Sequence, residues 1–104
     1  MTSSALWFIT AMKHTNTVTR YPGTASELAN EIGDLYYDAL ANHLHLLAQK
    51  MASDSAADAS RGHGKLAAEL LACSQHLAQA AQHIDPAWRI CEPFVDPVRK
   101  AAKP

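Results

Sequence analysis

The chain has 104 residues, 48% of them hydrophobic, and a formal net charge of -1. This length suits one domain with a modest core, and this composition predicts a folded protein rather than a disordered one. The balanced charge argues against a nucleic-acid-binding protein, which would need a basic excess. The longest apolar run, Ala5 to Ile9, is too short to cross a bilayer, so we expect no membrane association and a cytoplasmic location.

Three zones divide the predicted single domain, residues 1–104. Residues 1–23 are rich in threonine and carry an apolar patch, residues 24–84 are rich in alanine and leucine, and residues 85–104 are punctuated by prolines. Within the first zone we expect a short helix over residues 4–12, with a short strand pair as the competing interpretation. The second zone has helical periodicity and is predicted to form a hairpin.

The first long helix is predicted to cover about residues 25–60. It follows a break at Pro22-Gly23, and Thr24 and Glu27 have the spacing of a capping box, in which each side chain accepts from the other residue's backbone N–H. A loop from Ser53 onward is the alternative for the second half. We favour a helix there because small residues recur at helical spacing, which lets two helix axes come close. These residues are Ala48, Ala52, Ala56 and Ala59.

The second long helix is predicted to cover residues 64–84, after a turn in which Gly62 takes a left-handed conformation. Asp85-Pro86 should end this helix and can begin a short one over residues 86–91. Cys73 and Cys91 lack zinc-ligand spacing, and Cys73 is predicted to be a small core residue. The predicted core seam of the helix is Leu66, Leu70, Cys73, Leu77, Ala80 and Ile84.

The apolar face of the predicted first helix is unusually wide. On a helical wheel, its polar residues from Glu27 to Gln49 fall on a strip about 80° wide, and leucine, isoleucine, alanine, tyrosine and methionine occupy most of the rest. One partner helix cannot cover so much apolar surface. The sequence therefore predicts an all-α homodimer in which two hairpins pair into a four-helix bundle, with the aromatic termini filling gaps.

The acids of the polar strip need a partner or solvent. Glu31, Asp34 and Asp38 lie one helical turn apart, and no lysine or arginine occurs between Ala25 and Gln49, so neighbouring carboxylates repel. One interpretation is solvation, or an ion pair between Asp34 and Arg89 across the hairpin. The other is a Mg²⁺ site, because hard cations bind carboxylate oxygens.

The segment NEIGDLYYDAL, residues 30–40, resembles the second metal-binding helix of the all-α nucleotide pyrophosphohydrolases of the MazG and phosphoribosyl-ATP type. The resemblance covers about 20 residues and implies that Glu31 and Asp34 hold Mg²⁺ for hydrolysis of nucleotide polyphosphates. The chain departs from that family in its first half: the family has a preceding Glu-Glu-x-x-Glu helix, whereas residues 1–23 contain no acid.

The sequence thus predicts a non-enzymatic interaction or scaffold protein, with no catalytic residues and no cofactor. The alternative is the Mg²⁺-dependent pyrophosphohydrolase, or a degenerate relative, with Glu31, Asp34 and Asp38 as metal ligands. Trp88 and Phe94 lie in the terminal zone, and an exposed aromatic patch there would suit a further protein partner.

Overall fold

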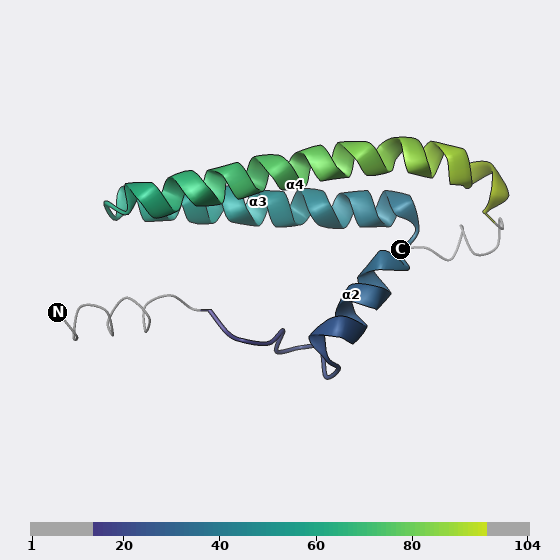
Figure 1. Ribbon diagram of the computed structural model, residues 1–104, viewed down its shortest axis with the longest axis horizontal. Coiled ribbons are helices and arrows are strands. Elements are labelled where there is room, and N and C mark those ends of the chain that lie inside the picture. Colours follow the sequence, from purple (N-terminus) through teal and green to yellow (C-terminus); the bar gives the residue numbers. More distant parts are fainter. Residues whose placement is uncertain (1–13, 96–104) are drawn as a thin grey trace. The chain divides into compact units, whose positions relative to one another are not determined.

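The computed structural model describes residues 14–95, which divide into two compact units at the Gly33–Asp34 peptide bond. The elements are helices α2 (Ala25–Gly33), α3 (Tyr37–Ser60) and α4 (Gly64–Cys91), followed by the 3₁₀ helix η1 (Glu92–Phe94) (Figure 1). The described part contains no strand, so the all-α class is confirmed. The predicted helix over residues 4–12 lies outside the described residues.

The N-terminal unit contains the predicted capping box. The Thr24 hydroxyl oxygen accepts from the Glu27 N–H at 3.1 Å, and the Glu27 carboxylate accepts from the Thr24 N–H at 2.8 Å. These two bonds satisfy backbone donors that the first turn of a helix leaves open, which is why α2 begins at Ala25. Residues 15–21 form bends and a turn without regular structure.

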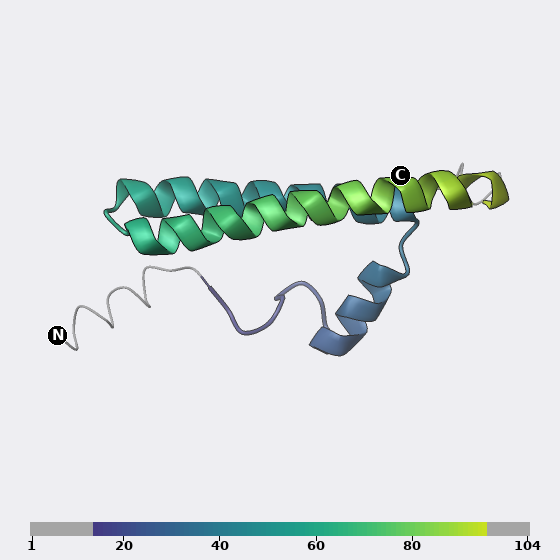
Figure 2. The same cartoon turned by 45° about the horizontal axis from the view of Figure 1, so that its top comes forward.

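The second unit is the predicted antiparallel hairpin. Helices α3 and α4 lie side by side in both views (Figures 1 and 2) and are joined by a tight turn. Gly62 has a φ of 82° there, and its N–H donates to the Ala59 carbonyl at 3.1 Å. A glycine adopts this left-handed conformation without steric cost, so the chain reverses within a few residues.

The two long helices meet along a seam of small residues at heptad spacing. Two side-chain hydrogen bonds cross it: Ser55 donates to the Ala67 carbonyl at 2.6 Å, and Ser74 donates to the Ala48 carbonyl at 2.7 Å. A serine side chain is short, so these bonds require a close approach of the two backbones. The buried residues that form this small-residue seam are Ala41, Ala48 and Ser55 of α3 and Ala67, Ser74 and Ala81 of α4.

The predicted first helix is interrupted. It ends at Gly33, and α3 begins only at Tyr37, with Tyr36 at φ -52° and ψ 145°. A glycine costs about 1 kcal/mol relative to alanine within a helix, and the two tyrosines that follow shortly after are weaker helix formers than leucine or alanine. The prediction of one helix over residues 25–60 is therefore corrected to two helices with a break at residues 34–36.

The second helix is longer than predicted. It runs through Pro86 to Cys91, so Asp85-Pro86 does not end it. A proline removes one hydrogen bond and crowds the preceding turn, which weakens a helix without always breaking it. Beyond Pro86, Trp88 contacts Tyr36 of the segment that leads into α3, with ring centroids 6.2 Å apart. The last turns of α4 therefore pack against Tyr36.

The predicted contact residues are also corrected. Ala48 is buried, but Ala56 and Ala59 are exposed, because the small-residue seam follows Ala41, Ala48 and Ser55 instead. Cys73 is exposed and is not a core residue. On α4 the predicted seam of Leu66, Leu70, Leu77 and Ile84 is only half-buried, because Ala67, Ser74 and Ala81 occupy the contact with α3.

Candidate functional site

The large apolar side chains of the hairpin gather on one side of the small-residue seam. On a helical wheel of α3, these side chains are rotated by about 40° to 100° from Ala48. On a wheel of α4, they are rotated from Ser74 by the same angles and in the same direction. Equal rotations in two antiparallel helices reach the same face of the pair. We call this the leucine face: Leu40, Leu44, Leu47 and Met51 of α3, and Leu66, Leu70, Cys73, Leu77 and Ile84 of α4.

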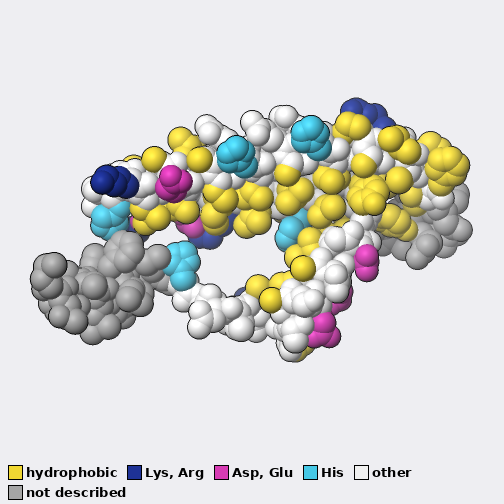
Figure 3. All heavy atoms as spheres, viewed as in Figure 1, with side chains coloured by type: hydrophobic (Ala, Val, Ile, Leu, Met, Phe, Trp, Pro, Cys, Tyr) yellow, Lys and Arg dark blue, Asp and Glu magenta, His cyan; other side chains and the backbone are white. Residues whose placement is uncertain are grey.

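No member of the leucine face is fully covered. Leu47 is 41% exposed, Cys73 is exposed, and the other seven are half-buried. Hydrophobic side chains run in a nearly continuous band along the hairpin, over both long helices (Figure 3). Monomeric soluble proteins rarely leave a large contiguous apolar patch open, and such patches mark sites of interaction.

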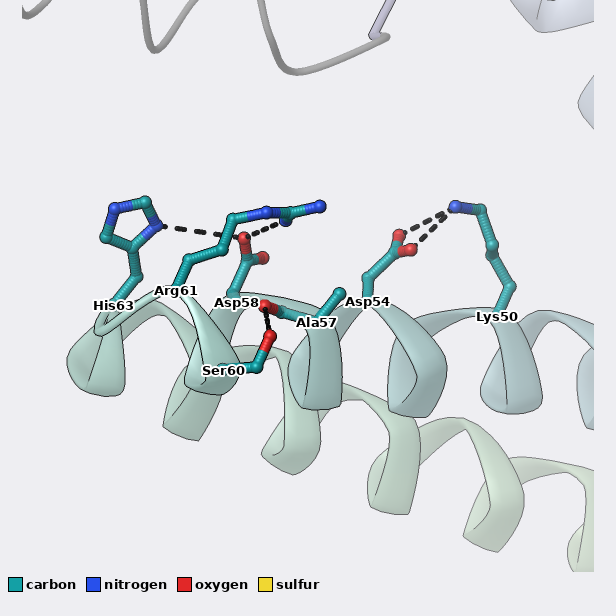
Figure 4. Close-up of polar contacts among 7 residues, drawn as sticks. All are labelled: Lys50, Asp54, Ala57, Asp58, Ser60, Arg61 and His63. Carbon is teal, nitrogen blue, oxygen red and sulfur yellow. Dashed lines mark hydrogen bonds and ion pairs between the residues drawn. The ribbon is translucent and has the colours of Figure 1, made fainter.

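Charged side chains gather toward the turn end of the hairpin (Figure 4). Asp54 accepts from the Lys50 ammonium at 2.7 Å, and Asp58 accepts from the Arg61 guanidinium at 3.2 Å. The His63 ring nitrogen Nδ1 lies 3.9 Å from the Asp58 carboxylate. These ion pairs are within one helix or its turn, so they hold the acids locally and give the apolar surface a polar border.

Aromatic residues mark the opposite end of the hairpin. The rings of Tyr36 and Trp88 pack at an interplanar angle of 52°. Ile90 and Phe94 lie beyond them and are largely exposed, Phe94 at 87% of its surface. Of the two residues of the predicted aromatic patch, Phe94 is exposed, while Trp88 is half-buried against Tyr36.

The three predicted metal ligands lie in different local settings. Glu31 belongs to α2 and accepts a hydrogen bond from the Tyr21 hydroxyl. Asp34 is exposed in the break between helices, and Asp38 accepts from the Ala39 N–H at 2.8 Å in the first turn of α3. Because the helix is interrupted, its periodicity no longer places these acids on one strip.

The described residues contain no group of three histidine, cysteine, aspartate or glutamate side chains that could hold a metal ion. The predicted ion pair between Asp34 and Arg89 does not form, and both side chains are exposed. A hollow in the N-terminal unit is lined by residues from 15 to 32, among them Val18, Leu28 and Ile32. Tyr21 is the sole ionisable residue in that lining, so the hollow offers no pair of acid and base groups.

The predicted seam does not include Ser55 and Ser74, which tie the two long helices together. A signal for them exists: small residues recur every seven positions in both helices, at 41, 48 and 55 and at 67, 74 and 81. That repeat is the heptad of closely packed helices. The leucines are larger and also have helical spacing, so the sequence pattern favours them for the seam.

No helix within residues 14–95 is both long enough and apolar enough to cross a membrane. In comparisons with known proteins, no family model, no curated protein and no solved structure matches the chain.

Proposed function

We propose that the protein is a small non-enzymatic interaction module that acts as a homodimer, with two hairpins packed into a four-helix bundle. One observation carries this proposal. The buried residues of the described hairpin are alanines and serines, and none of its large apolar side chains is fully buried. The hairpin on its own thus has a close contact but very little hydrophobic core.

The energetics favour a partner. Burying apolar surface contributes about 25 cal/mol per Å², or about 1.5–3 kcal/mol for a large side chain that becomes fully buried. Four buried alanines contribute little of this, while ordering each residue costs about 1–2 kcal/mol of backbone entropy. Small folds with a sparse core need an added source of stability, and oligomerisation is one of them. A second hairpin supplies it by covering the half-buried leucines.

The chemistry of the exposed surface fits binding. Leucine, isoleucine and methionine side chains bind by burial and carry no proton-transfer chemistry. We place the module in the cytoplasm, a reducing compartment in which Cys73 and Cys91 would stay thiols. The exposed Phe94 is proposed as a contact for a further protein partner. The magnesium-dependent hydrolase alternative is carried only by the resemblance of residues 30–40.

Sedimentation equilibrium of the full chain at micromolar concentration tests the proposal. We expect twice the chain mass, with dissociation on dilution. The variant Phe94→Ala should keep the dimer, because Phe94 lies outside the leucine face. A chain that stays monomeric up to high micromolar concentration contradicts the homodimer and the four-helix bundle together.

A further inference from the structure

We propose that the leucine face is the surface on which a second copy of this chain docks, face to face. This inference rests on the proposed homodimer and adds where the two copies meet. The alternative surfaces are the opposite side of the hairpin and the aromatic end. The choice among them follows from composition, extent and charge.

The two broad sides of the hairpin differ in composition. The leucine face carries seven leucine, isoleucine or methionine side chains from α3 and α4 that are half-buried, together with Leu47 and Cys73. On the opposite side of the small-residue seam lie polar or small side chains, with Leu71 as the exception. The polar or small residues on this opposite side are His45, Gln49 and Ala52 of α3 and Gln75, Ala78 and Gln82 of α4.

The extent of the leucine face comes near the smallest area that specific protein interfaces bury. From Leu66 to Ile84 an α-helix is about 27 Å long, and two adjacent helices are about 20 Å wide. The leucine face therefore has a flat, projected area of about 550 Å² per copy. The uneven surface of the side chains adds to this area. Two such faces bury about 1,100 Å², close to the lower end for specific protein interfaces.

The charge pattern favours a second copy over a charged partner. Within the leucine face there is no carboxylate, ammonium or guanidinium group, and the acids Asp54 and Asp58 at its turn end are already paired with Lys50 and Arg61. A partner for such a face must itself present an uncharged apolar surface of similar length. The same face on another copy meets this requirement, and a two-fold interface uses one patch twice.

Neighbouring leucines provide a matched test of the docking surface. Leu47 belongs to the leucine face and is 41% exposed, whereas Leu46 points away from it and is 53% exposed. In the full chain, Leu47→Glu should weaken dimerisation by at least about 100-fold, because it buries an unpaired carboxylate in the interface. Leu46→Glu places the same charge one residue away and should change the dimer dissociation constant by less than about 3-fold.

Sedimentation equilibrium of both variants separates this inference from the proposed homodimer. If the wild-type chain is a dimer and both variants keep it, or both weaken it alike, the leucine face is not the interface, although the homodimer stands. Leu70→Glu and Leu71→Glu repeat the comparison on α4, where Leu71 is 46% exposed and lies outside the face. A monomeric wild-type chain overturns both proposals.

Cys73 provides a second measurement that needs no substitution within the leucine face. Its thiol is exposed on the leucine face in the single chain. In a Cys91→Ser chain, alkylation of Cys73 by iodoacetamide should slow at protein concentrations above the dimer dissociation constant. An alkylation rate that is the same for monomer and dimer overturns the inference. If Cys73 is alkylated slowly in a chain that is monomeric at every concentration, another segment of the same chain covers the leucine face. That result also overturns the inference.

Discussion

Single side chains decide how closely α3 and α4 approach. The hydroxyls of Ser55 and Ser74 donate to carbonyl oxygens of the facing helix at 2.6 and 2.7 Å. Each such bond stabilises the fold by about 0.5–1.5 kcal/mol. Their larger effect is on geometry, because a short side chain reaches the opposite backbone only when no larger residue keeps the helices apart.

An overpacking substitution should show this. Ala48→Leu inserts three carbon atoms into the small-residue seam, where Ala48 is 6% exposed, and should reduce the free energy of unfolding by about 1–3 kcal/mol. Ala56→Leu is the matched control: Ala56 is exposed on the same helix, so its effect should stay within about 0.5 kcal/mol. Urea unfolding at fixed protein concentration measures both. Equal losses would place the close contact elsewhere.

The capping box of α2 should respond to pH. The pKa of the Glu27 carboxyl is lowered, first by the backbone hydrogen bond from Thr24 and then by the bond with the Thr24 side chain. Because the folded-state pKa lies below the ordinary value, the carboxylate stabilises α2 above the ordinary glutamate pKa, and this contribution is lost as pH falls through the lowered pKa.

Carbon-13 NMR can follow both the Glu27 carboxyl and the Cα shifts of residues 25–28. The carboxyl should titrate below an ordinary glutamate, and the helical shifts should decrease with it. Glu27→Gln keeps an acceptor for the Thr24 N–H but cannot titrate, so its helical shifts should not follow that titration. A Glu27 carboxyl that titrates as in an unfolded peptide would contradict the capping box in solution.

The acids at residues 31–38 allow a direct test of the metal alternative. We expect millimolar Mg²⁺ to leave the melting temperature unchanged, because residues 14–95 bring too few carboxylates together to bind a hard cation. Glu31→Gln with Asp34→Asn should then melt at or slightly above the wild-type temperature. If Mg²⁺ instead stabilises the wild-type chain in proportion to the logarithm of its concentration, and the double variant loses this effect, the acids do bind metal.

The helices and their ends follow local rules with two exceptions. Thr24 and Glu27 cap the start of α2, and Gly62 takes a left-handed conformation in the turn after α3, as their residue types predict. The break after Gly33 and the continuation through Pro86 do not follow from the same rules. At Gly33 a modest helix penalty ends the helix, whereas at Pro86 a larger penalty is tolerated in a helix held by its packing.

Two glycines, one in the turn and one at the start of α4, offer a matched pair of substitutions. Gly62→Ala should reduce the free energy of unfolding by about 1–2 kcal/mol, because its φ of 82° is unfavourable for a residue with a Cβ. Gly64→Ala should be neutral or stabilising by up to about 1 kcal/mol, since it starts α4 without a positive φ. A new Cβ meets nothing within 4 Å at either position. Chemical denaturation measures both, and a neutral Gly62→Ala would contradict the left-handed turn.

Within the described residues, the hairpin fully buries only alanine and serine side chains, and its large apolar side chains stay at least partly exposed. A thin interior of alanine and serine fixes the register of α3 on α4, but large side chains are left at the surface. Stability should then depend on association, so it should change with protein concentration.

Thermal unfolding at several concentrations tests this. For a dimer that unfolds to separate chains, a 100-fold increase in concentration should stabilise the folded state by about 2.7 kcal/mol and raise the melting temperature by several degrees. Leu47→Glu should unfold at a lower temperature that is independent of concentration, while Leu46→Glu should behave like the wild type. A wild-type midpoint that does not move with concentration would show that the chain is stable as a monomer.

Local sequence signals determined the fold class, the start of α2 and the turn at Gly62, because helix periodicity, capping and left-handed glycines depend on neighbours in the chain. Tertiary structure decided which face of each helix meets the other. Leucines and alanines share the same helical spacing, so periodicity alone favoured Leu66, Leu70 and Leu77 for the seam. The structure places Ala67, Ser74 and Ala81 there instead, where the serine hydrogen bonds require close backbones, and leaves the leucines for another surface.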